Sequence, residues 1–368
     1  MADMISMLPD EVLCHILSFL PTEEVVTTMV LSKRWKPLWP LVSTLDFYDH
    51  RYLDFKEFKS HFSFIRFVYA TMFSRGLNQP IKNFTLIVRE QCLDTDVKVW
   101  LNAAIQQPQL ENLNVDLSLS ILPCSILSSA SLVVFKLHNV TFDVFSSVYL
   151  PSLKTLHLDN AWITRLRYLM ELLYGCPVLE DLILNDIDFN DCSFEGKVKT
   201  LSKLVRADVI FDSYRHLIPV KAFSNVEFLR IDECDVEIPV FSNLIHLELI
   251  FGDFIKWSLA LDMLNHCPKL QTLVFELNFG HDDDDDEVWP YQRFVPECFS
   301  SHLRKCFLKY FKGLECQMRF ARYVMQNSAS LRTMTIHCKG QNREKELEMI
   351  EELASYPRSS SNCKLLFE

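Results

Sequence analysis

A repeating pattern of apolar and polar positions runs along most of the chain. Its unit is L-x-x-L-x-L, with other apolar residues allowed at the fixed positions, and the last four residues alternate between apolar and polar. Such alternation predicts a short β-strand with one buried side and one polar side. Clear copies begin at Leu110, Leu132, Leu153, Leu179, Val226, Leu244, Leu270 and Leu331, and weaker copies at Ile81, Leu204 and Leu303.

Between the predicted strands, several stretches have the spacing of amphipathic helices. The stretch "AWITRLRYLMELLYGCP" places Ile163, Leu166 and Leu173 on one helical face before Pro177, and "WSLALDMLNHCP" ends in the same Cys-Pro pair. Successive copies of the pattern lie 18 to 33 residues apart, centred on the roughly 20–29 residues of leucine-rich repeats. The pattern therefore predicts an α/β solenoid of about ten units, with parallel strands and covering helices.

The turns after the predicted strands depart from a standard repeat. Where such repeats keep Asn or Cys, only Cys234 fits, and other copies hold Val140, Ala161, Ile187 and Gly252. We therefore expect irregular turns. Cys176 and Cys267 stand between a helix and a strand without a basic neighbour, and we expect them to pack rather than to react.

The first fifty residues have a different pattern, that of three short helices. In "LPDEVLCHILSFLP", Pro9 suits a helix start, the acidic pair after it complements the helix dipole, and Pro21 stops the run. Thr22 can cap a second helix, and Ser32 a third that carries Trp35. Three helices in about 40 residues lie near the lower limit for an independent core. Part of their apolar surface therefore needs a partner, either the rest of the chain or another protein.

This segment, with the following "VVTTMVLSKRWKPLW", resembles an F-box in the order, spacing and type of its residues. The resemblance implies docking to a Skp-family adaptor and, through it, to a cullin-RING ubiquitin ligase. The adaptor contacts that it implies are Leu8, Pro9, Ile16, Leu17, Leu20, Pro21, Val30, Leu31 and Trp35.

The C-terminal region, with "LRKCFLKYFKG", "ECQMRFARYVMQNSASLRTMTI" and "CKLLFE", resembles the FBD module of plant F-box/leucine-rich-repeat proteins. It reads as two more strand-helix units, with Phe320 and Val324 on a helix ahead of Leu331. We predict an F-box over residues 1–45, leucine-rich repeats over 80–280, and an FBD-like cap that continues the solenoid over 293–367.

Composition and charge narrow the possible functions. The net charge of −11 disfavours nucleic acid as a partner. No apolar run approaches the roughly 20 residues of a membrane span, and no secretion signal or paired-cysteine motif is present, so we expect a soluble chain in the nucleus or cytoplasm with reduced thiols. The acidic run Asp282–Glu287 lacks the spacing of a calcium loop and reads as a solvated loop. No catalytic or phosphate-binding motif is present, so we expect neither enzymatic activity nor a cofactor.

The leading hypothesis is a substrate-recognition subunit of an SCF-type E3 ubiquitin ligase, which the F-box resemblance implies. The polar side of the strands would then hold a target protein, and the candidate residues are Thr155, His157, Asp159, Asp181, Asn185, Arg230, Asp232, His246 and Glu248. Two alternatives stay open: a protein-binding scaffold without ubiquitin transfer, and a receptor for a small molecule.

Overall fold

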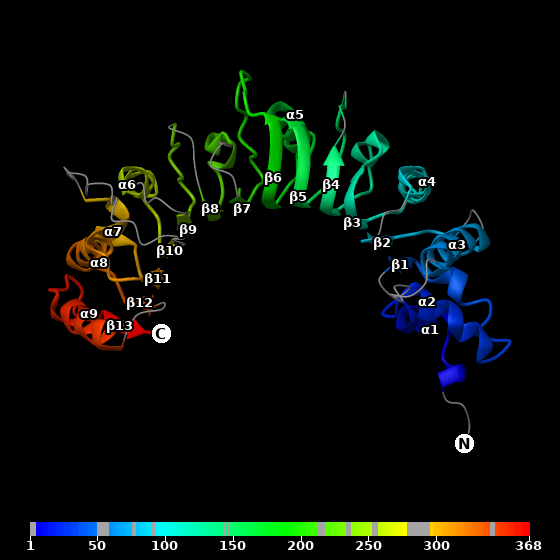
Figure 1. The fold of residues 1–368 in the computed structure, drawn as a ribbon, viewed down its shortest axis with the longest axis horizontal. Coiled ribbons are helices and arrows are strands. Elements are labelled where there is room, and N and C mark those ends of the chain that lie inside the picture. The colour runs from blue at the N-terminus through cyan, green and yellow to red at the C-terminus, as the bar shows by residue number, and fades with distance from the viewer. Residues whose placement is uncertain are drawn as a thin grey trace. The chain divides into compact units, whose positions relative to one another are not determined.

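The computed structural model describes residues 5–49, 59–75, 79–89, 93–142, 144–145, 147–211, 218–232, 237–251, 257–277, 295–338 and 343–368. Within these residues the chain is mixed α/β, and thirteen strands form a parallel sheet in the order of the sequence (Figure 1). The predicted fold class is therefore confirmed. The acidic run Asp282–Glu287 and the turn residues Cys234 and Gly252 lie outside the described residues.

The strands are β1 Thr44–Tyr48, β2 Asn83–Val88, β3 Asn112–Ile121, β4 Val134–Phe142, β5 Thr155–Arg165, β6 Asp181–Asp191, β7 Arg206–Ile210, β8 Phe228–Ile231, β9 His246–Phe251, β10 Thr272–Leu277, β11 Lys305–Phe311, β12 Thr333–Cys338 and β13 Lys364–Phe367. The α-helices are α1 Asp10–Leu17, α2 Thr22–Thr27, α3 Lys59–Ser74, α4 Asp94–Ile105, α5 Leu166–Tyr174, α6 Trp257–Asn265, α7 Glu297–Ser301, α8 Glu315–Asn327 and α9 Arg343–Ser355.

The repeat pattern located the strands β2 to β12, since each predicted copy contains one of them. The described residues contain two further strands. For β1, Val42, Leu45 and Phe47 fit the pattern, but they directly follow the F-box motif and were not counted as a repeat. The short strand β13 has a polar residue, Asn362, at the first position of the pattern, where an apolar one is expected.

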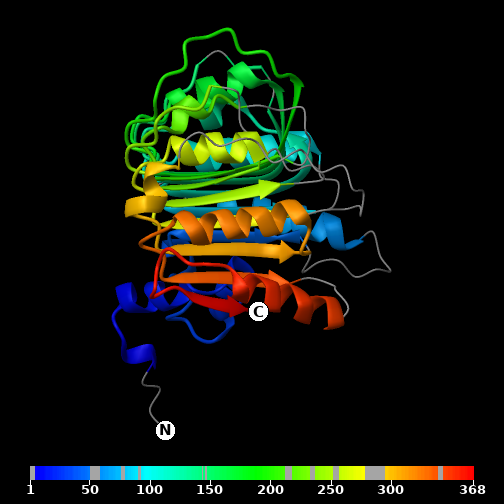
Figure 2. The ribbon, with the colours of Figure 1, turned by 90° about the vertical axis from the view of Figure 1, so that its left-hand side faces the viewer.

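The chain divides into two compact units. Unit 1 consists of residues 1–179 with 185–194, and unit 2 of residues 180–184 with 195–368. Within unit 1, β1 to β5 pair in sequence order, and within unit 2, β7 to β13 do the same. Figure 2 shows the strands of unit 2 stacked and pointing the same way. The predicted boundaries at residues 45, 80, 280 and 293 stay a prediction.

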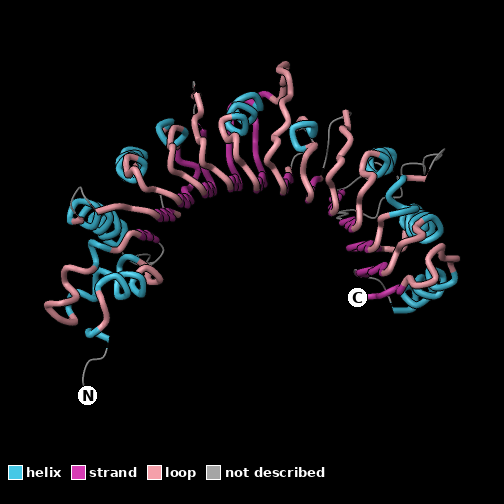
Figure 3. The backbone as a smooth tube through the Cα atoms, turned by 180° about the vertical axis from the view of Figure 1, so that it is seen from behind, coloured by secondary structure: helices cyan, strands magenta, loops and turns pink. Residues whose placement is uncertain are grey.

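Except for β13, which has no buried residue, the strands bury apolar side chains on one side and leave mostly polar side chains on the other. In β5 the side chains of Leu156 and Leu158 are fully buried, whereas Thr155 and His157 are half-buried. The helices between the strands lie on the buried side in both units (Figure 3). We call the opposite side, which carries the half-buried polar residues of the strands, the open face. Burying the apolar side against helices stabilises the stack by roughly 25 cal/mol per Å² of apolar area.

Two of the stretches predicted to be irregular turns continue as strands through a residue in the left-handed conformation. Asn139 in β4 and Asn160 in β5 have φ angles of 52° and 49°, in the left-handed region that asparagine tolerates. Asn160 Nδ2 donates to Asn139 Oδ1 at 2.6 Å, and Asn139 Nδ2 donates to Asp116 Oδ1 at 2.7 Å. After the asparagine each strand continues with a buried residue, Val140 in β4 and Ala161 in β5.

The longer strands change one predicted helix. Ile163 was expected on the helix before Pro177, but it lies on β5, which runs to Arg165, and is buried there. The helix α5 starts only at Leu166. The prediction was wrong for Ile163 because a β-branched residue also suits a strand, and the pairing of β5 with β4 continues to this residue, opposite Phe142.

Two predictions about the first fifty residues are also wrong. Residues 32–42 form hydrogen-bonded turns and a 3-10 helix, Trp39–Leu41, instead of a third α-helix. Pro37 and Pro40 lack the backbone N–H groups that an α-helix needs there. Thr22 does not cap α2: its buried hydroxyl accepts the backbone N–H of Asp46 at 2.7 Å, and Pro21 occupies the cap position.

Candidate functional site

The small N-terminal bundle has its own apolar core. Its buried members are Leu13, Leu17, Val25, Trp35, Leu38, Trp39 and Val42. Two predicted adaptor contacts, Leu17 and Trp35, belong to this core and are only 1% and 8% exposed. In the chain without a partner, these two side chains therefore lie in the core of the bundle and are not part of its exposed surface.

The same bundle exposes many large apolar side chains. Of the predicted contacts, Val30, Leu31 and Ile16 are 84%, 64% and 43% exposed. Leu8, Leu20 and Pro21 are half-buried, and Pro9 is exposed. Sequence reasoning missed Met7 and Phe19, which are 76% and 75% exposed. Exposed apolar groups gathered in one short segment are typical of a protein interaction site.

Arg34 brings the two ends of this motif together. Its Nη2 donates to the backbone oxygen of Leu8 and pairs with Asp10 Oδ1 at 3.1 Å. The turn residues 33–35 and the Leu8-Pro9 pair, about 25 positions apart in sequence, thus lie side by side. Both partners of the ion pair are exposed, so the pair itself stabilises the bundle by at most about 1 kcal/mol.

The candidate target residues of unit 1 lie on the open face, as the alternation predicted. Thr155, His157 and Asp159 of β5 are all half-buried. Asp159 is the centre of a cluster: Oδ2 lies 3.0 Å from His138 Nδ1, and Oδ1 accepts the side-chain N–H of Asn185 at 2.6 Å. The structure therefore brings Asp159 and Asn185 together and adds His138, which sequence reasoning missed.

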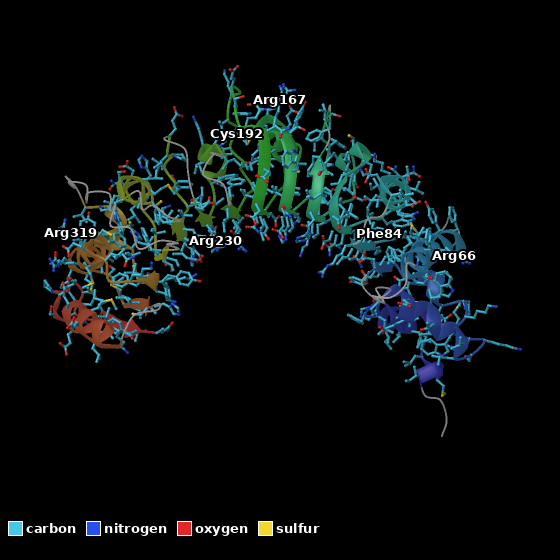
Figure 4. All side chains as sticks on the ribbon, in the orientation of Figure 1. Arg66, Phe84, Arg167, Cys192, Arg230 and Arg319 are labelled. Carbon is cyan, nitrogen blue, oxygen red and sulfur yellow. The ribbon has the colours of Figure 1, made fainter. Side chains whose placement is uncertain are left out.

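The candidate residues of unit 2 form a larger network of charges on β7, β8 and β9. Arg230 Nη1 lies 3.4 Å from Asp208 Oδ1, and its Nε lies 3.4 Å from Glu248 Oε2. Glu248 Oε1 lies 2.7 Å from His246 Nε2, and Asp208 Oδ2 accepts an N–H of Arg206 at 3.0 Å. Arg230 projects from the open face in Figure 4. The network combines three predicted residues with Arg206 and Asp208, which were not predicted.

An aromatic ring closes this network. The guanidinium carbon of Arg206 lies 4.6 Å from the centre of the Phe228 ring, and that ring stacks on His246 with centroids 4.7 Å apart. The strand register explains why the Phe228 ring contacts both side chains, because Arg206, Phe228 and His246 are direct neighbours across three strands. Such contacts hold the cationic side chains in one orientation and lower the entropy that binding would cost.

The two remaining candidates, Asp181 and Asp232, are half-buried in unit 2. Asp232 Oδ2 accepts the backbone N–H of Phe211 at 2.6 Å, so this carboxylate fixes the end of a strand. Asp181 is the first residue of β6.

The network lowers the pKa of the Glu248 carboxyl. The hydrogen bond from His246 is the largest influence and lowers the pKa of this carboxyl, and the charges of His246, Lys309 and Arg230 act in the same direction, against its partial burial. Glu248 therefore stays an anion well into acidic solution and holds the cations around it.

The cysteines at the helix-strand junctions are buried, as expected. Cys176 and Cys267 are 1% and 0% exposed, and burial raises the pKa of Cys176 to about 12. Burial raises the pKa of Cys267 as well. A thiol that stays protonated at neutral pH is a poor nucleophile and metal ligand.

A pocket opens on unit 2 between β11 and β12. Its volume is about 300 Å³, and its lining includes Phe307, Lys309, Tyr310, Thr335 and His337. The described residues contain no group of three or more His, Cys, Asp or Glu side chains placed to hold a metal ion. Among the helices in the described part of the chain, none is long and apolar enough to cross a membrane.

Comparison with known proteins agrees with both sequence resemblances. The F-box domain model matches residues 5–44, and the FBD model matches residues 291–336. An F-box/FBD/LRR-repeat protein of Arabidopsis thaliana is 31% identical over 430 aligned positions, which cover 100% of both chains. Two FBD-associated F-box proteins of the same plant are 31% and 28% identical, and the alignments cover 99% and 100% of this chain and 100% and 97% of the relatives.

Proposed function

The chain belongs to the F-box/FBD/LRR-repeat family, and we propose that it is the substrate-recognition subunit of an SCF-type E3 ubiquitin ligase. In this proposal the F-box binds a Skp-family adaptor, which connects the chain to a cullin-RING ligase, and the open face of the repeats binds a target protein. The chain catalyses no step itself. It accelerates ubiquitin transfer by holding the target close to a ubiquitin-loaded enzyme.

The observation that carries the proposal is the exposed apolar surface of the F-box. Val30 and Leu31 are 84% and 64% exposed although they are aliphatic. The core of seven buried residues in the same bundle holds the backbone that carries these two side chains in place. Fully burying one such side chain in an interface stabilises it by roughly 1.5–3 kcal/mol. An adaptor that covers this surface would gain most of its affinity there.

We place this activity in the nucleus or the cytoplasm. None of the ten described cysteines forms a disulfide with another described residue, and Cys124 is exposed. Thiols in this number suit a reducing compartment.

The test is the affinity of the full chain for a purified Skp-family adaptor, measured by calorimetry. Val30→Ser with Leu31→Ser removes two exposed aliphatic side chains without opening a cavity, and we expect binding to weaken at least about tenfold. The matched control is Leu93→Ser with Val240→Ser, which removes side chains that are 69% and 59% exposed outside the F-box.

We expect the control variant to bind the adaptor as the native chain does. The proposal fails if the native chain does not bind the adaptor, or if both double variants bind it with native affinity. Circular dichroism of all three proteins separates lost binding from lost folding.

A further inference from the structure

The open face of unit 2 presents its cations outward and keeps its carboxylates behind them. The side chains of Arg206 and Arg230 are 39% and 30% exposed, whereas Asp208 between them is 12% exposed. Glu248 is 18% exposed, against 30% for both of its partners, Arg230 and His246. An incoming molecule therefore meets guanidinium and imidazole groups before it meets a carboxylate.

On the next strands, too, the cation is more exposed than the carboxylate that it pairs with. Lys309 of β11 is 43% exposed and lies 3.2 Å from Glu276 of β10, whose side chain is 12% exposed. Another carboxylate of this region, Asp232, is engaged by the backbone N–H of Phe211. The buried carboxylates thus fix the cations in position without covering them.

Two further lysines extend the cationic surface. Lys305 at the start of β11 and Lys364 at the start of β13 are exposed and share one register position, with Thr333 between them. Neither lysine makes an ion pair with another described residue. In a chain with a net charge of −11, this surface is distinct because the most exposed charged side chains of its strands are cations, which attract anionic groups at short range.

We propose that the open face of unit 2, from β7 to β11, is the surface that takes the target, and that it takes a segment of the target rich in aspartate and glutamate. This inference rests on the proposed function, because it names the class of partner for the target site. Five neighbouring strands span about 19 Å at about 4.8 Å per strand, which is the length of roughly six extended residues. The guanidinium groups of Arg206 and Arg230 are preoriented by these contacts, and the N–H donors that they do not use within the network can bind a carboxylate of the target.

The test measures binding of a fluorescein-labelled hexaglutamate peptide to the full chain by fluorescence anisotropy, with labelled hexalysine as the peptide control. We expect the chain to bind hexaglutamate and not hexalysine, and the affinity to fall as salt is raised from 50 to 200 mM, by about fivefold or more. The variant Arg206→Gln with Arg230→Gln should weaken binding at least about tenfold.

A matched control removes the same two charges elsewhere in the unit. Arg319 and Arg322 lie on α8, with Arg319 on the helix side in Figure 4, and their side chains are 52% and 48% exposed. Arg319→Gln with Arg322→Gln should leave hexaglutamate binding within about twofold of native. Because the network variant leaves Asp208 without its two arginine partners and Glu248 with His246 alone, Lys305→Ser serves as a second variant. Lys305 lies on β11 and makes no ion pair with another described residue, and we expect its replacement to weaken binding about threefold.

The inference is overturned if hexaglutamate does not bind at 1 mM peptide, about the weakest affinity that a specific site would show, or if the control variant weakens binding as much as the open-face variants do. Adaptor affinity is measured on the same samples and should be native for all of these variants. Peptide binding without adaptor binding would contradict the proposed function alone, and adaptor binding without peptide binding would contradict this inference alone.

Discussion

The charged network on β7, β8 and β9 shows how far single residues can be interpreted from the sequence. Arg230, His246 and Glu248 could be placed on one face because each alternates with buried residues of its strand. Their partners could not be named, since contacts across strands depend on the register between repeats of unequal length. Asp208 was missed because it lies in a weak copy of the repeat, where Ala207 takes the place of a large apolar residue.

The lowered pKa of Glu248 predicts a pH dependence of stability. A carboxyl whose pKa is lower in the folded state stabilises the fold above its unfolded pKa, and this contribution is lost as the pH falls through the folded value. We therefore expect Glu248→Gln to lower the free energy of unfolding by roughly 1–3 kcal/mol at about pH 6. The difference in unfolding free energy between the variant and the native chain should shrink as the pH falls below 4.5, the usual pKa of a glutamate carboxyl.

Urea denaturation at several pH values measures this difference. Glu227→Gln is the control, because Glu227 is exposed and directly precedes β8. A difference between native chain and Glu248→Gln that stays constant from neutral pH to pH values well below the usual carboxyl pKa would contradict the assigned role of the His246–Glu248 contact.

At the scale of elements, the sequence predicted strands better than helices. The strand pattern needs only a few alternating residues, and each copy is repeated along the chain, so the prediction located β2 to β12. Helix predictions failed where the sequence allowed two structures. Residues 32–42 carry two prolines within a helical apolar pattern, and Ile163 fits both a strand and a helix.

The repeats of unit 2 are joined by an aromatic cluster at the element scale. Phe320 on α8 lies 5.2 Å from the Trp257 ring on α6 and 4.5 Å from the Phe275 ring on β10, and all three are at most 1% exposed. We expect Phe320→Ala to lower the free energy of unfolding by about 3–5 kcal/mol, because it leaves a cavity between α8, α6 and β10.

Thermal and urea denaturation of this variant measure the loss. Arg319→Ala, one position away on the exposed side of α8, should change the free energy of unfolding by less than about 0.5 kcal/mol. If Phe320→Ala were no more destabilising than Arg319→Ala, the packing of α8 against α6 and β10 would be contradicted.

At the scale of the whole molecule, the sequence indicated two candidate binding surfaces, the F-box and the polar side of the strands, but not which of their residues are exposed. The F-box motif indicated an adaptor interface, yet burial separates its members into supporting residues such as Leu17 and surface residues such as Val30. This division could not be predicted from spacing, because the turns after α2 depart from helical geometry. The identity of the target is not encoded in any residue pattern.

The central claim is that one chain holds an adaptor at its F-box and a target on its repeats, so that the target receives ubiquitin. The most direct test compares cells that express the native chain with cells that express Val30→Ser with Leu31→Ser, and measures ubiquitin attachment on the proteins that co-purify with each. We predict that both forms retain the same proteins through the repeats and that ubiquitin on those proteins falls severalfold with the variant. Equal ubiquitin attachment with both forms would contradict the claim and would favour a scaffold that binds proteins without directing ubiquitin to them.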